Sequence, residues 1–363
     1  MDTPRKSLSI LYIVPTVGET SCAYNEFSRP LSGSHNITLC SYCKATVTPP
    51  PNITLFEGDG TVLGFFRTLK AALNNSRYDI IHGHMAASGV LFLIANLLHR
   101  RPLKSTVFTV HNCYQNHKFR NRLLLIPVFI FFQRVVCCSR SALESFPSFY
   151  KWLAGSRLSA IQNGVDMRRV DSILGERQQS DDRDRFTVLS VGRIIKIKNP
   201  STVLNAFRQS SNPTNRLVFV GEGDLLAALT AKINECGLEE QVEVTGLIPR
   251  NEVYQALAQA DVFISTSFGE GLPVAALEAM ACRCPVILSD IQPHWEIATG
   301  TDFIPLVPAD DENGFAQQLR KFQTMPLAER EAIGEKCRAW AEDHFSLTAM
   351  HKRYTALYEQ LCI

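Results

Sequence analysis

The feature that most constrains this fold is a repeated alternation of short apolar runs with segments of helical spacing. Runs such as "SILYIVP" (9–15) are apolar at almost every position, which is typical of parallel strands whose sheet is covered on both faces. Segments such as "TVLGFFRTLKAALN" (61–74) carry apolar residues at the three- and four-residue spacing of a helix. Strands that alternate with helices in this way predict an α/β fold with parallel sheets.

The alternation runs twice, before and after a polar, charged stretch at 174–185, "LGERQQSDDRDR", which we interpret as a linker. Strands are expected in the first half at 9–15, 37–42, 79–84, 106–111, 134–139 and 158–163. Strands are expected in the second half at 186–192, 217–223, 241–246, 261–267 and 284–290. A chain of 363 residues is long enough for two domains. We predict two doubly wound domains, 1–170 and 171–345, and a terminal helix at 346–363.

The composition excludes several classes of protein. Apolar residues make up 45% of the chain and charged residues 20%, which is ordinary for a globular protein. A formal net charge of +2 argues against a dedicated nucleic-acid binder, and we expect no nucleic-acid partner. The 11 cysteines are odd in number and scattered, so we expect reduced, buried thiols in a cytoplasmic protein. Cys40 and Cys43 lack a second pair with zinc-finger spacing, so no zinc site is predicted.

Two apolar segments resemble export or membrane signals. In "MDTPRKSLSILYIVP" (1–15), basic residues precede a short apolar run, but no small-residue cleavage site follows, which favours a first strand. The longest apolar run, "LLLIPVFIFF" (123–132), is half the length of a membrane span and contains Pro127. We expect a core or interfacial helix there.

Two glutamates eight positions apart are the first candidates for a binding site. Glu270 lies in a glycine-flanked turn and Glu278 in the helix expected after it, in "FGEGLPVAALEAM" (268–280). The turn follows an expected strand, at the edge where open α/β sheets bind ligands. A helix start suits phosphate, Gly271 lets a ligand approach the backbone, and the carboxylates suit sugar or ribose hydroxyls. The alternative is that both glutamates lie on a solvated helix face.

Two cations lie at the corresponding place after another strand. Arg193 and Lys198, in "SVGRIIKIKNP" (190–200), follow the first expected strand of the second half and precede its first helix. Two cations at this edge can neutralise a diphosphate leaving group without a metal ion. The alternative is a solvated basic turn.

Together these segments resemble family 4 retaining glycosyltransferases of the two-domain GT-B architecture. The resemblance rests on the Glu-x7-Glu pair Glu270 and Glu278, preceded by Arg193 and Lys198 five positions apart. "QNGVD" (162–166) and the terminal helix after "HFS" also resemble the family, densely in the second half and loosely in the first. The resemblance implies two Rossmann-like domains that face each other across a cleft. In that family the N-terminal domain takes the acceptor, the C-terminal domain binds the nucleotide-sugar donor, and the C-terminal helix crosses back to the N-terminal domain.

The resemblance also implies roles for the matching residues. Arg193 and Lys198 would hold the donor diphosphate, Glu270 would contact hydroxyls of the transferred sugar, and Glu278 would hold the ribose. The turn "TGLIP" (245–249) would frame the base, mostly through its backbone. The implied donor-binding residues are Gly18, Arg193, Lys198, Leu247, Glu270, Gly271, Leu272 and Glu278. The implied catalytic residues are His111, Arg193, Lys198 and Glu270.

The first half carries the weaker part of the resemblance. His111, in "TVHN", stands where the family has a histidine beside the donor sugar, and its alternative is a capped strand end. His82 and His84 are interpreted as structural or acceptor-facing. The family's first loop often carries paired glycines, whereas "PTVGETS" has only Gly18. Asn199 stands where glycine often follows the lysine.

The resemblance implies transfer with retention of the anomeric configuration, through front-face attack and a short-lived ion pair. Arg193, Lys198 and the helix start would stabilise the charge on the departing phosphate, and domain closure would exclude water. We expect no metal and no cofactor, since the nucleotide sugar is a substrate. Asp182-Arg183-Asp184 matches the Asp-x-Asp of metal-using transferases, but it lies in the polar linker and is interpreted as solvated charge.

Two other functions remain open: a metal-free sugar-nucleotide epimerase of the same architecture, and a non-catalytic glycosyltransferase-like partner subunit. "GEGDLL" (221–226) also invites a dinucleotide-binding interpretation, but it lacks a third glycine and we favour a tight turn.

The acceptor is predicted from a single segment, "NHKFRNRLLLIPVFIFFQR" (116–134). Cations precede an apolar stretch there, a pattern expected of a helix at an anionic membrane surface. We expect a cytoplasmic enzyme, peripheral at the inner face of the membrane, that moves a hexose from a UDP-sugar or GDP-mannose to a saccharide or lipid-linked acceptor in cell-surface polysaccharide or lipopolysaccharide assembly. The alternative is a buried helix with basic ends. No oligomeric state is predicted.

Overall fold

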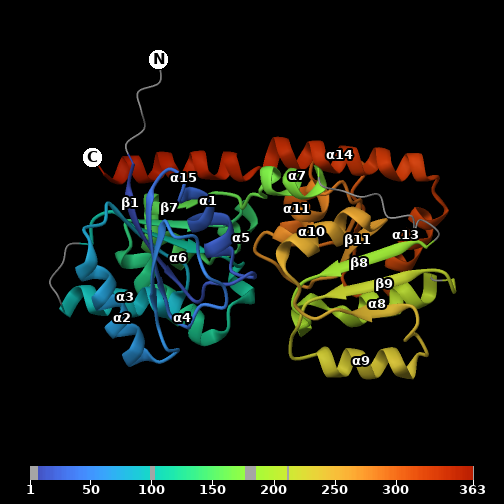
Figure 1. Cartoon of the computed structure of the whole chain (residues 1–363), viewed down its shortest axis with the longest axis horizontal. Helices are drawn as coiled ribbons and strands as arrows, with labels where there is room; N and C mark the ends of the chain where they lie inside the picture. The colour runs from blue at the N-terminus through green and yellow to red at the C-terminus, as the bar shows by residue number, and fades with distance from the viewer. Residues whose placement is uncertain (1–6, 99–102, 176–184, 211, 363) are drawn as a thin grey trace, which may run out of the picture. The chain divides into compact units, whose positions relative to one another are not determined.

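The computed structural model describes residues 7–98, 103–175, 185–210 and 212–362 (Figure 1). The chain divides into two compact units, Met1–Asn163 with Thr348–Ile363, and Gly164–Leu347. Each unit is an α/β structure with one parallel sheet, as the alternation of apolar runs predicts.

The first unit is built on a parallel sheet whose strands, within the described residues, follow the order β3-β2-β1-β4-β5-β6-β7. The strands are β1 (Ser9–Val14), β2 (Asn36–Ser41), β3 (Ile53–Glu57), β4 (Ile80–Gly83), β5 (Thr106–Val110), β6 (Arg134–Cys137) and β7 (Leu158–Ala160). In the register of the sheet, Ile13 pairs with Cys40 on one side and with Gly83 on the other. The order reverses direction between β1 and β4, which is the pattern of a doubly wound fold.

Helices cover both faces of this sheet. They are η1 (Ala23–Ser28), α1 (Arg29–Leu31), α2 (Val62–Asn75), α3 (Ala86–Leu98), η2 (Tyr114–Asn116), α4 (Phe119–Phe131), α5 (Arg140–Ser145), α6 (Ser148–Ala154), η3 (Gly155–Arg157) and α15 (Leu347–Leu361). Helix α2 begins where predicted, because the side chain of Thr61 accepts a hydrogen bond from the amide of Gly64. Strand β3 was not predicted from the sequence.

The second unit repeats the arrangement with the strand order β10-β9-β8-β11-β12-β13 among the residues described. Its strands are β8 (Thr187–Val191), β9 (Arg216–Val220), β10 (Val242–Val244), β11 (Val262–Ser265), β12 (Val286–Ser289) and β13 (Leu306–Val307). Its helices are α7 (Met167–Gly175), η4 (Lys196–Lys198), α8 (Pro200–Ser210), α9 (Leu226–Glu235), α10 (Arg250–Gln259), α11 (Val274–Ala281), α12 (Gln292–Ala298), α13 (Glu312–Thr324) and α14 (Leu327–Phe345). Pro200 opens α8 and Gly237, at a φ of +64°, follows α9, as expected from the sequence.

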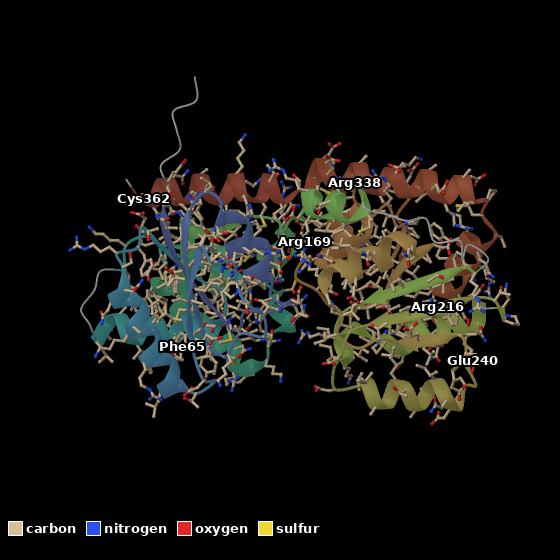
Figure 2. The ribbon with its side chains drawn as sticks, in the orientation of Figure 1. Phe65, Arg169, Arg216, Glu240, Arg338 and Cys362 are labelled. Atoms are coloured by element: carbon tan, nitrogen blue, oxygen red, sulfur yellow. The ribbon has the colours of Figure 1, made fainter. Side chains whose placement is uncertain are left out.

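The two units divide at Asn163/Gly164, seven residues before the expected boundary at 170/171. The reason is that Val165, Met167 and Val170 are buried in a core of the second unit. Arg338 of α14, which is labelled in Figure 2, is buried and donates to the Asp171 carboxylate of α7 at 2.9 Å.

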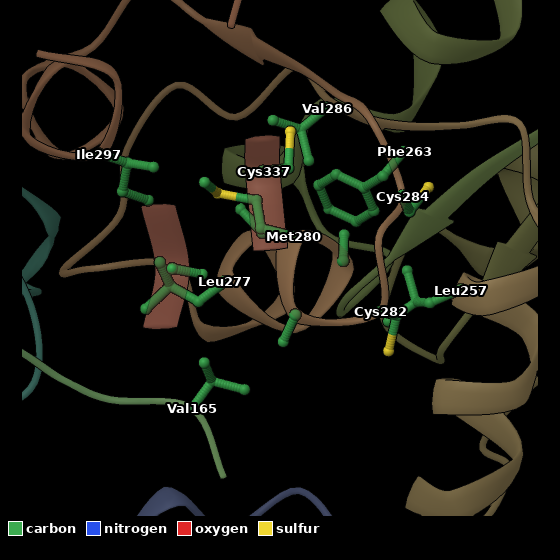
Figure 3. Packing of buried hydrophobic residues seen from close by; sticks show 14 of the residues in the cluster. Val165, Leu257, Phe263, Leu277, Met280, Cys282, Cys284, Val286, Ile297 and Cys337 are labelled. Carbon is green, nitrogen blue, oxygen red and sulfur yellow. The ribbon is translucent and has the colours of Figure 1, made fainter. Parts of the chain in front are cut away.

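The main core of the second unit surrounds α11, with Leu277 and Met280 packed among residues of the neighbouring strands and helices (Figure 3). This core also contains Cys282, Cys284 and Cys337, so sulfur fills space that aliphatic side chains fill elsewhere. All the cysteines are free thiols, as expected, but Cys43 and Cys362 are exposed rather than buried.

The C-terminal helix α15 returns to the first unit, as predicted. The hydroxyl of Tyr358 lies 2.7 Å from Nδ1 of His82 on β4, and the hydroxyl of Tyr354 lies 3.0 Å from Oγ1 of Thr109 on β5. His82 is also bonded to Thr109, at 2.7 Å, and is fully buried, so its role in the structure is to anchor this helix.

Candidate active site

In the second unit the strand order reverses between β8 and β11, which are neighbours in the sheet. Ligands of doubly wound folds bind at such a switch point, at the carboxyl ends of the strands. Two loops meet there, one after β8 (192–199) and one after β11 (266–273), and they carry the predicted cations and Glu270.

The loop after β8 is held by the segment that follows β9. The amide of Ile194 donates to the carbonyl of Glu222 at 2.8 Å, and the amide of Leu225 donates to the carbonyl of Ile194 at 3.0 Å. A Cβ on Gly221 would lie 2.1 Å from the carbonyl oxygen of Gly192, and Gly221 has a φ of +141°. The glycines of "GEGDLL" therefore serve close packing of one loop on another, in agreement with the tight turn favoured from the sequence.

Asn199 ends this loop in the left-handed conformation, with a φ of +52°. Asparagine tolerates this conformation better than most residues, which explains how it replaces the glycine often found after the lysine. Its side-chain amide donates to the carbonyl of Ala309 at 2.7 Å, and its own carbonyl accepts from Thr266 at 2.8 Å. The residue after Lys198 is therefore fixed from two sides.

Lys198 and Glu270 form an ion pair, with Nζ 2.5 Å from Oε1. The same carboxylate oxygen accepts a hydrogen bond from the hydroxyl of Ser267 at 2.7 Å. Burial raises the pKa of Glu270, but the charge of Lys198 and these hydrogen bonds outweigh it, so the pKa lies below its ordinary value. Arg193 is exposed and forms no ion pair with the residues that the structure describes.

A pocket opens between these loops and the ends of the strands. Its polar and charged lining includes Arg193, Lys198 and Glu270. The full lining is Ser190, Val191, Gly192, Arg193, Ile194, Lys198, Pro200, Phe219, Phe263, Ile264, Ser265, Ser267, Glu270, Pro273, Ala275 and Ala276. Two cations, one carboxylate and the start of α11 therefore border one cavity, which suits a ligand that is anionic at one end and rich in hydroxyls at the other.

Glu278 lies about one turn into α11 and is buried, not part of a solvated helix face. Its Oε1 accepts from Nε of Arg250, the first residue of α10, at 2.7 Å. Arg250 also contacts the hydroxyl of Tyr254, at 3.2 Å. Arg250 was not predicted from the sequence, and its position at the start of α10, just after the "TGLIP" turn, was the available signal.

The remaining donor-binding candidates of the second unit lie around these residues. Gly271 and Leu272 are buried in the turn between Glu270 and Pro273, which directly precedes α11. Leu247 is 58% exposed in the turn after β10. None of these three lines the pocket described above.

In the first unit the corresponding edge carries paired histidines. Nδ1 of His84 lies 2.9 Å from Nε2 of His111, and the two rings are stacked. Burial lowers the pKa of His111 to about 4, with a smaller contribution from the charge of His117, so His111 is neutral at pH 7. Gly18 lies in the loop after β1, and a Cβ there would meet Oγ1 of Thr46 at 2.4 Å.

Two further properties concern the described part of the chain. None of its helices has both the length and the apolar character required to span a membrane. The same residues contain no group of three or more His, Cys, Asp or Glu side chains placed to hold a metal ion. Asp182, Arg183 and Asp184, interpreted from the sequence as solvated charge, lie outside the described residues.

Two family models together match most of the chain. One, described as Glycosyltransferase Family 4, matches residues 32–169, and the other, described as Glycosyl transferases group 1, matches residues 175–340. The chain belongs to the glycosyltransferases that these two models describe. The glycosyltransferase has the GT-B fold. It is similar in structure to Anabaena HepE, whose crystal structure contains UDP and glucose, with a TM-score of 0.78 and 18% sequence identity. The match covers 97% of this chain and 100% of that chain.

Two curated relatives show what the glycosyltransferase is similar to. The UDP-Gal:alpha-D-GlcNAc-diphosphoundecaprenol alpha-1,3-galactosyltransferase of Escherichia coli is 27% identical over 66% of this chain and 64% of its own length. The N-acetylgalactosamine-N,N'-diacetylbacillosaminyl-diphospho-undecaprenol 4-alpha-N-acetylgalactosaminyltransferase of Campylobacter jejuni is 31% identical over 46% of this chain and 45% of its own length. The glycosyltransferase thus spans less than two thirds of the length of both relatives.

Proposed function

We propose that the enzyme transfers a hexose from a UDP-sugar, with GDP-mannose as the alternative donor, to a lipid-linked saccharide in cell-surface polysaccharide or lipopolysaccharide assembly. The observation that carries the proposal is the pocket at the switch point of the second unit, bordered by Arg193, Lys198 and Glu270. The names of the two relatives, which specify transfer to diphosphoundecaprenol-linked sugars, support the acceptor class. The UDP bound to Anabaena HepE supports the donor.

In this proposal the diphosphate lies between the two cations and the start of α11. Lys198 exchanges its ion pair with Glu270 for a phosphate oxygen, and exposed Arg193 supplies the second positive charge. The Glu270 carboxylate then accepts hydrogen bonds from hydroxyls of the sugar, while Glu278 accepts from the ribose. The buried turn at Gly271 and Leu272 would lie beside the sugar and Leu247 beside the base.

We propose that transfer retains the anomeric configuration. Departure of the nucleoside diphosphate leaves an oxocarbenium-like sugar, and the acceptor hydroxyl attacks from the face that the phosphate has just left, passing its proton to an oxygen of the departing phosphate. Arg193 and Lys198 stabilise the negative charge that develops on the departing phosphate. Such electrostatic stabilisation of the transition state is usually the largest single contribution to catalysis. Neutral His111, at the edge of the first unit, is proposed to contact the donor sugar, together with the loop at Gly18.

The test separates the transferase from its two alternatives. The purified protein is incubated with UDP-glucose, UDP-galactose, their N-acetyl forms or GDP-mannose, with and without a lipid-linked saccharide. A transferase releases the nucleoside diphosphate faster when acceptor is present. An epimerase would convert the donor without acceptor, and a non-catalytic subunit would change none of these donors. Either of these results contradicts the proposal.

We also propose that the enzyme lies against an anionic membrane through one face of its first unit. Helix α4 is apolar on both sides: Leu125, Val128 and Phe129 are buried, whereas Phe119 and Leu123 are exposed on the opposite side. Other exposed apolar residues lie on α3 and α6, and α4 packs against both of these helices. We call this set the α3–α4–α6 face: Ile94, Leu97 and Leu98 of α3, Phe119, Leu123, Ile130 and Phe131 of α4, and Phe149 and Trp152 of α6.

Charge supports an anionic membrane as the occupant of this face. The sequence from 80 to 143 contains eight Lys and Arg residues and no Asp or Glu. Phe119, 74% exposed in this cationic segment, and Trp152, 76% exposed on the neighbouring helix α6, complement a bilayer with anionic headgroups. The alternative interpretation of 116–134, a buried helix with basic ends, describes one side of α4 only, since Phe119 and Leu123 are exposed.

Sedimentation with lipid vesicles tests this contact. The enzyme is expected to pellet with phosphatidylcholine vesicles that contain phosphatidylglycerol and to stay in solution with phosphatidylcholine alone. The double variant Phe119→Ser/Trp152→Ser should lose binding, while Leu327→Ser, at an exposed leucine of the second unit, should keep it. Failure of the wild type to bind either vesicle, or dimerisation that the double variant abolishes, would contradict a membrane as the occupant.

A further inference from the structure

Behind Glu270, a chain of buried hydrogen bonds leads away from the pocket into the sheet. The hydroxyl of Ser267 donates to Oε1 of Glu270 at 2.7 Å, and the hydroxyl of Ser289 donates to the carbonyl of Ser267 at 2.6 Å. Ser267 lies in the loop after β11, whereas Ser289 is the last residue of β12. The turn that carries the candidate carboxylate is therefore tied to the next strand of the sheet.

His294, in α12, is the last residue of this hydrogen-bond chain. Its Nδ1 lies 2.8 Å from the carbonyl oxygen of Ser289 and 3.0 Å from the hydroxyl oxygen of the same residue. A carbonyl oxygen can only accept, so Nδ1 carries the proton and donates to it. The hydroxyl of Ser289 has its own proton directed at Ser267, which leaves its oxygen free to accept from His294 as well.

The chain consists of buried groups. Ser289 and His294 are fully buried, and Ser267 and Glu270 are nearly so. Nε2 of His294 is buried and has no hydrogen-bond partner within the described residues. Burial lowers the pKa of His294 to about 4, and Lys198 lowers it further while Glu270 raises it, so the ring is neutral at pH 7. A neutral donor can hold this turn without cancelling the negative charge of the carboxylate.

We infer that Ser267, Ser289 and His294 are positioning residues, which hold the Glu270 carboxylate in place for the hydroxyls of the donor sugar. The inference rests on the proposed function, because it deepens the role of Glu270 there. Its physical basis is that Oε1 of Glu270 accepts hydrogen bonds from both Lys198 and Ser267. When a diphosphate attracts Lys198, the Ser267 hydrogen bond remains to fix the carboxylate.

Two measurements separate the positioning role from a general structural one: kcat/KM for the nucleotide sugar and the Kd for the free nucleoside diphosphate. The variants Ser267→Ala, Ser289→Ala and His294→Ala are compared with the wild type, using the nucleotide sugar that the wild type turns over. Loss of a hydrogen bond to a charged group predicts a fall in kcat/KM of roughly tenfold to a hundredfold for Ser267→Ala. The Kd for the free nucleoside diphosphate should stay within about twofold, because the proposed function places Glu270 against the sugar and not against the nucleotide.

His294→Asn supplies the control for His294→Ala. The side-chain nitrogen of asparagine lies close to the position of Nδ1, so this variant retains the donor and should recover most of the kcat/KM lost in His294→Ala. Unchanged kcat/KM in Ser267→Ala and His294→Ala, or an equal loss of nucleoside diphosphate affinity, would overturn the inference. A wild type that turns over no nucleotide sugar would instead contradict the proposed function.

One readout is independent of activity. The ¹⁵N chemical shifts of His294 in the ligand-free protein report which ring nitrogen carries the proton. The hydrogen-bond chain requires the neutral Nδ1–H form at pH 7. A dominant Nε2–H form would overturn the chain even in an enzyme that is fully active.

Discussion

Nζ of Lys198 and Oε1 of Glu270 lie 2.5 Å apart, although 72 positions separate the two residues in the sequence. One comes from the loop after β8 and the other from the loop after β11, and these strands are neighbours at the point where the strand order reverses. The fold thus places a cation and a carboxylate together at the edge where this architecture binds ligands. In the absence of ligand each neutralises the other, and a diphosphate with its sugar can satisfy both.

The two glutamates of the Glu-x7-Glu pair should respond differently to the same substitution. Glu270→Gln is expected to weaken binding of the nucleotide sugar by about tenfold or more and to leave binding of the nucleoside diphosphate nearly unchanged. Glu278→Gln should weaken both ligands by a similar factor, because its proposed partner is the ribose. Calorimetric titration with each ligand measures this, and identical patterns in the two variants would contradict the assigned roles.

Removing one partner of the Arg250–Glu278 pair should lower the free energy of unfolding more than replacing both partners. Both side chains are mostly buried, so Arg250→Met leaves an uncompensated carboxylate and is expected to lower the free energy of unfolding by about 3–5 kcal/mol. The double variant Arg250→Met/Glu278→Met removes both charges and should recover most of this loss, but not nucleotide binding. Urea unfolding of the three proteins provides the comparison. A double variant less stable than Arg250→Met would show that this explanation is wrong.

Stability should fall as the pH drops below 6.5. The pKa of His294 is lowered from 6.5 to about 4 by burial, so between these values the unfolded chain binds the proton and the folded chain does not. Each such histidine removes roughly 1.4 kcal/mol per pH unit from the free energy of unfolding, and His111 has the same shift. His294→Asn should reduce this slope between pH 6.5 and 4, as measured by urea unfolding at several pH values. An unchanged slope would mean that His294 does not titrate in this way.

Much of the fold could be predicted because the strands and helices that support the site have a clear pattern of apolar residues. Strand β11 and helix α11 follow the apolar pattern closely, and Pro200 and Gly237 mark helix ends by backbone chemistry alone. Strand β3 was missed because it follows a run of prolines and is only partly buried. Strand β13 has two residues, too few for any period to be visible.

The candidate site was predictable only in part, for a physical reason. Glu270 and Lys198 stand in short motifs next to expected strand ends, so sequence spacing was sufficient to select them. Arg250 bonds to Glu278, 28 positions away, and Ser289 bonds to Ser267, 22 positions away, so the spacing of short motifs does not reveal these contacts. These roles appear only when the fold brings β12 beside β11 and α10 beside α11.

The close approach of two loops predicts a glycine-specific defect. Gly221→Ala would place a methyl group 2.1 Å from the carbonyl oxygen of Gly192 and force alanine to a φ of +141°. We expect a loss of stability of about 2 kcal/mol or more and weaker nucleotide binding, because the loop that carries Arg193 must move. Gly175→Ala is the control, since nothing lies within 4 Å of its added Cβ. Equal melting temperatures for the two variants would contradict the packing argument.

The most direct test of the central claim is the affinity for UDP, or for GDP where it binds better, measured by calorimetry on cation variants. Lys196, exposed on the same short helix as Lys198, provides a matched control. Lys198→Ala and Arg193→Ala are each predicted to raise the Kd by about tenfold or more, and Lys196→Ala by less than about twofold. If Lys198→Ala and Arg193→Ala both bind the nucleoside diphosphate as tightly as the wild type, the diphosphate does not lie in this pocket.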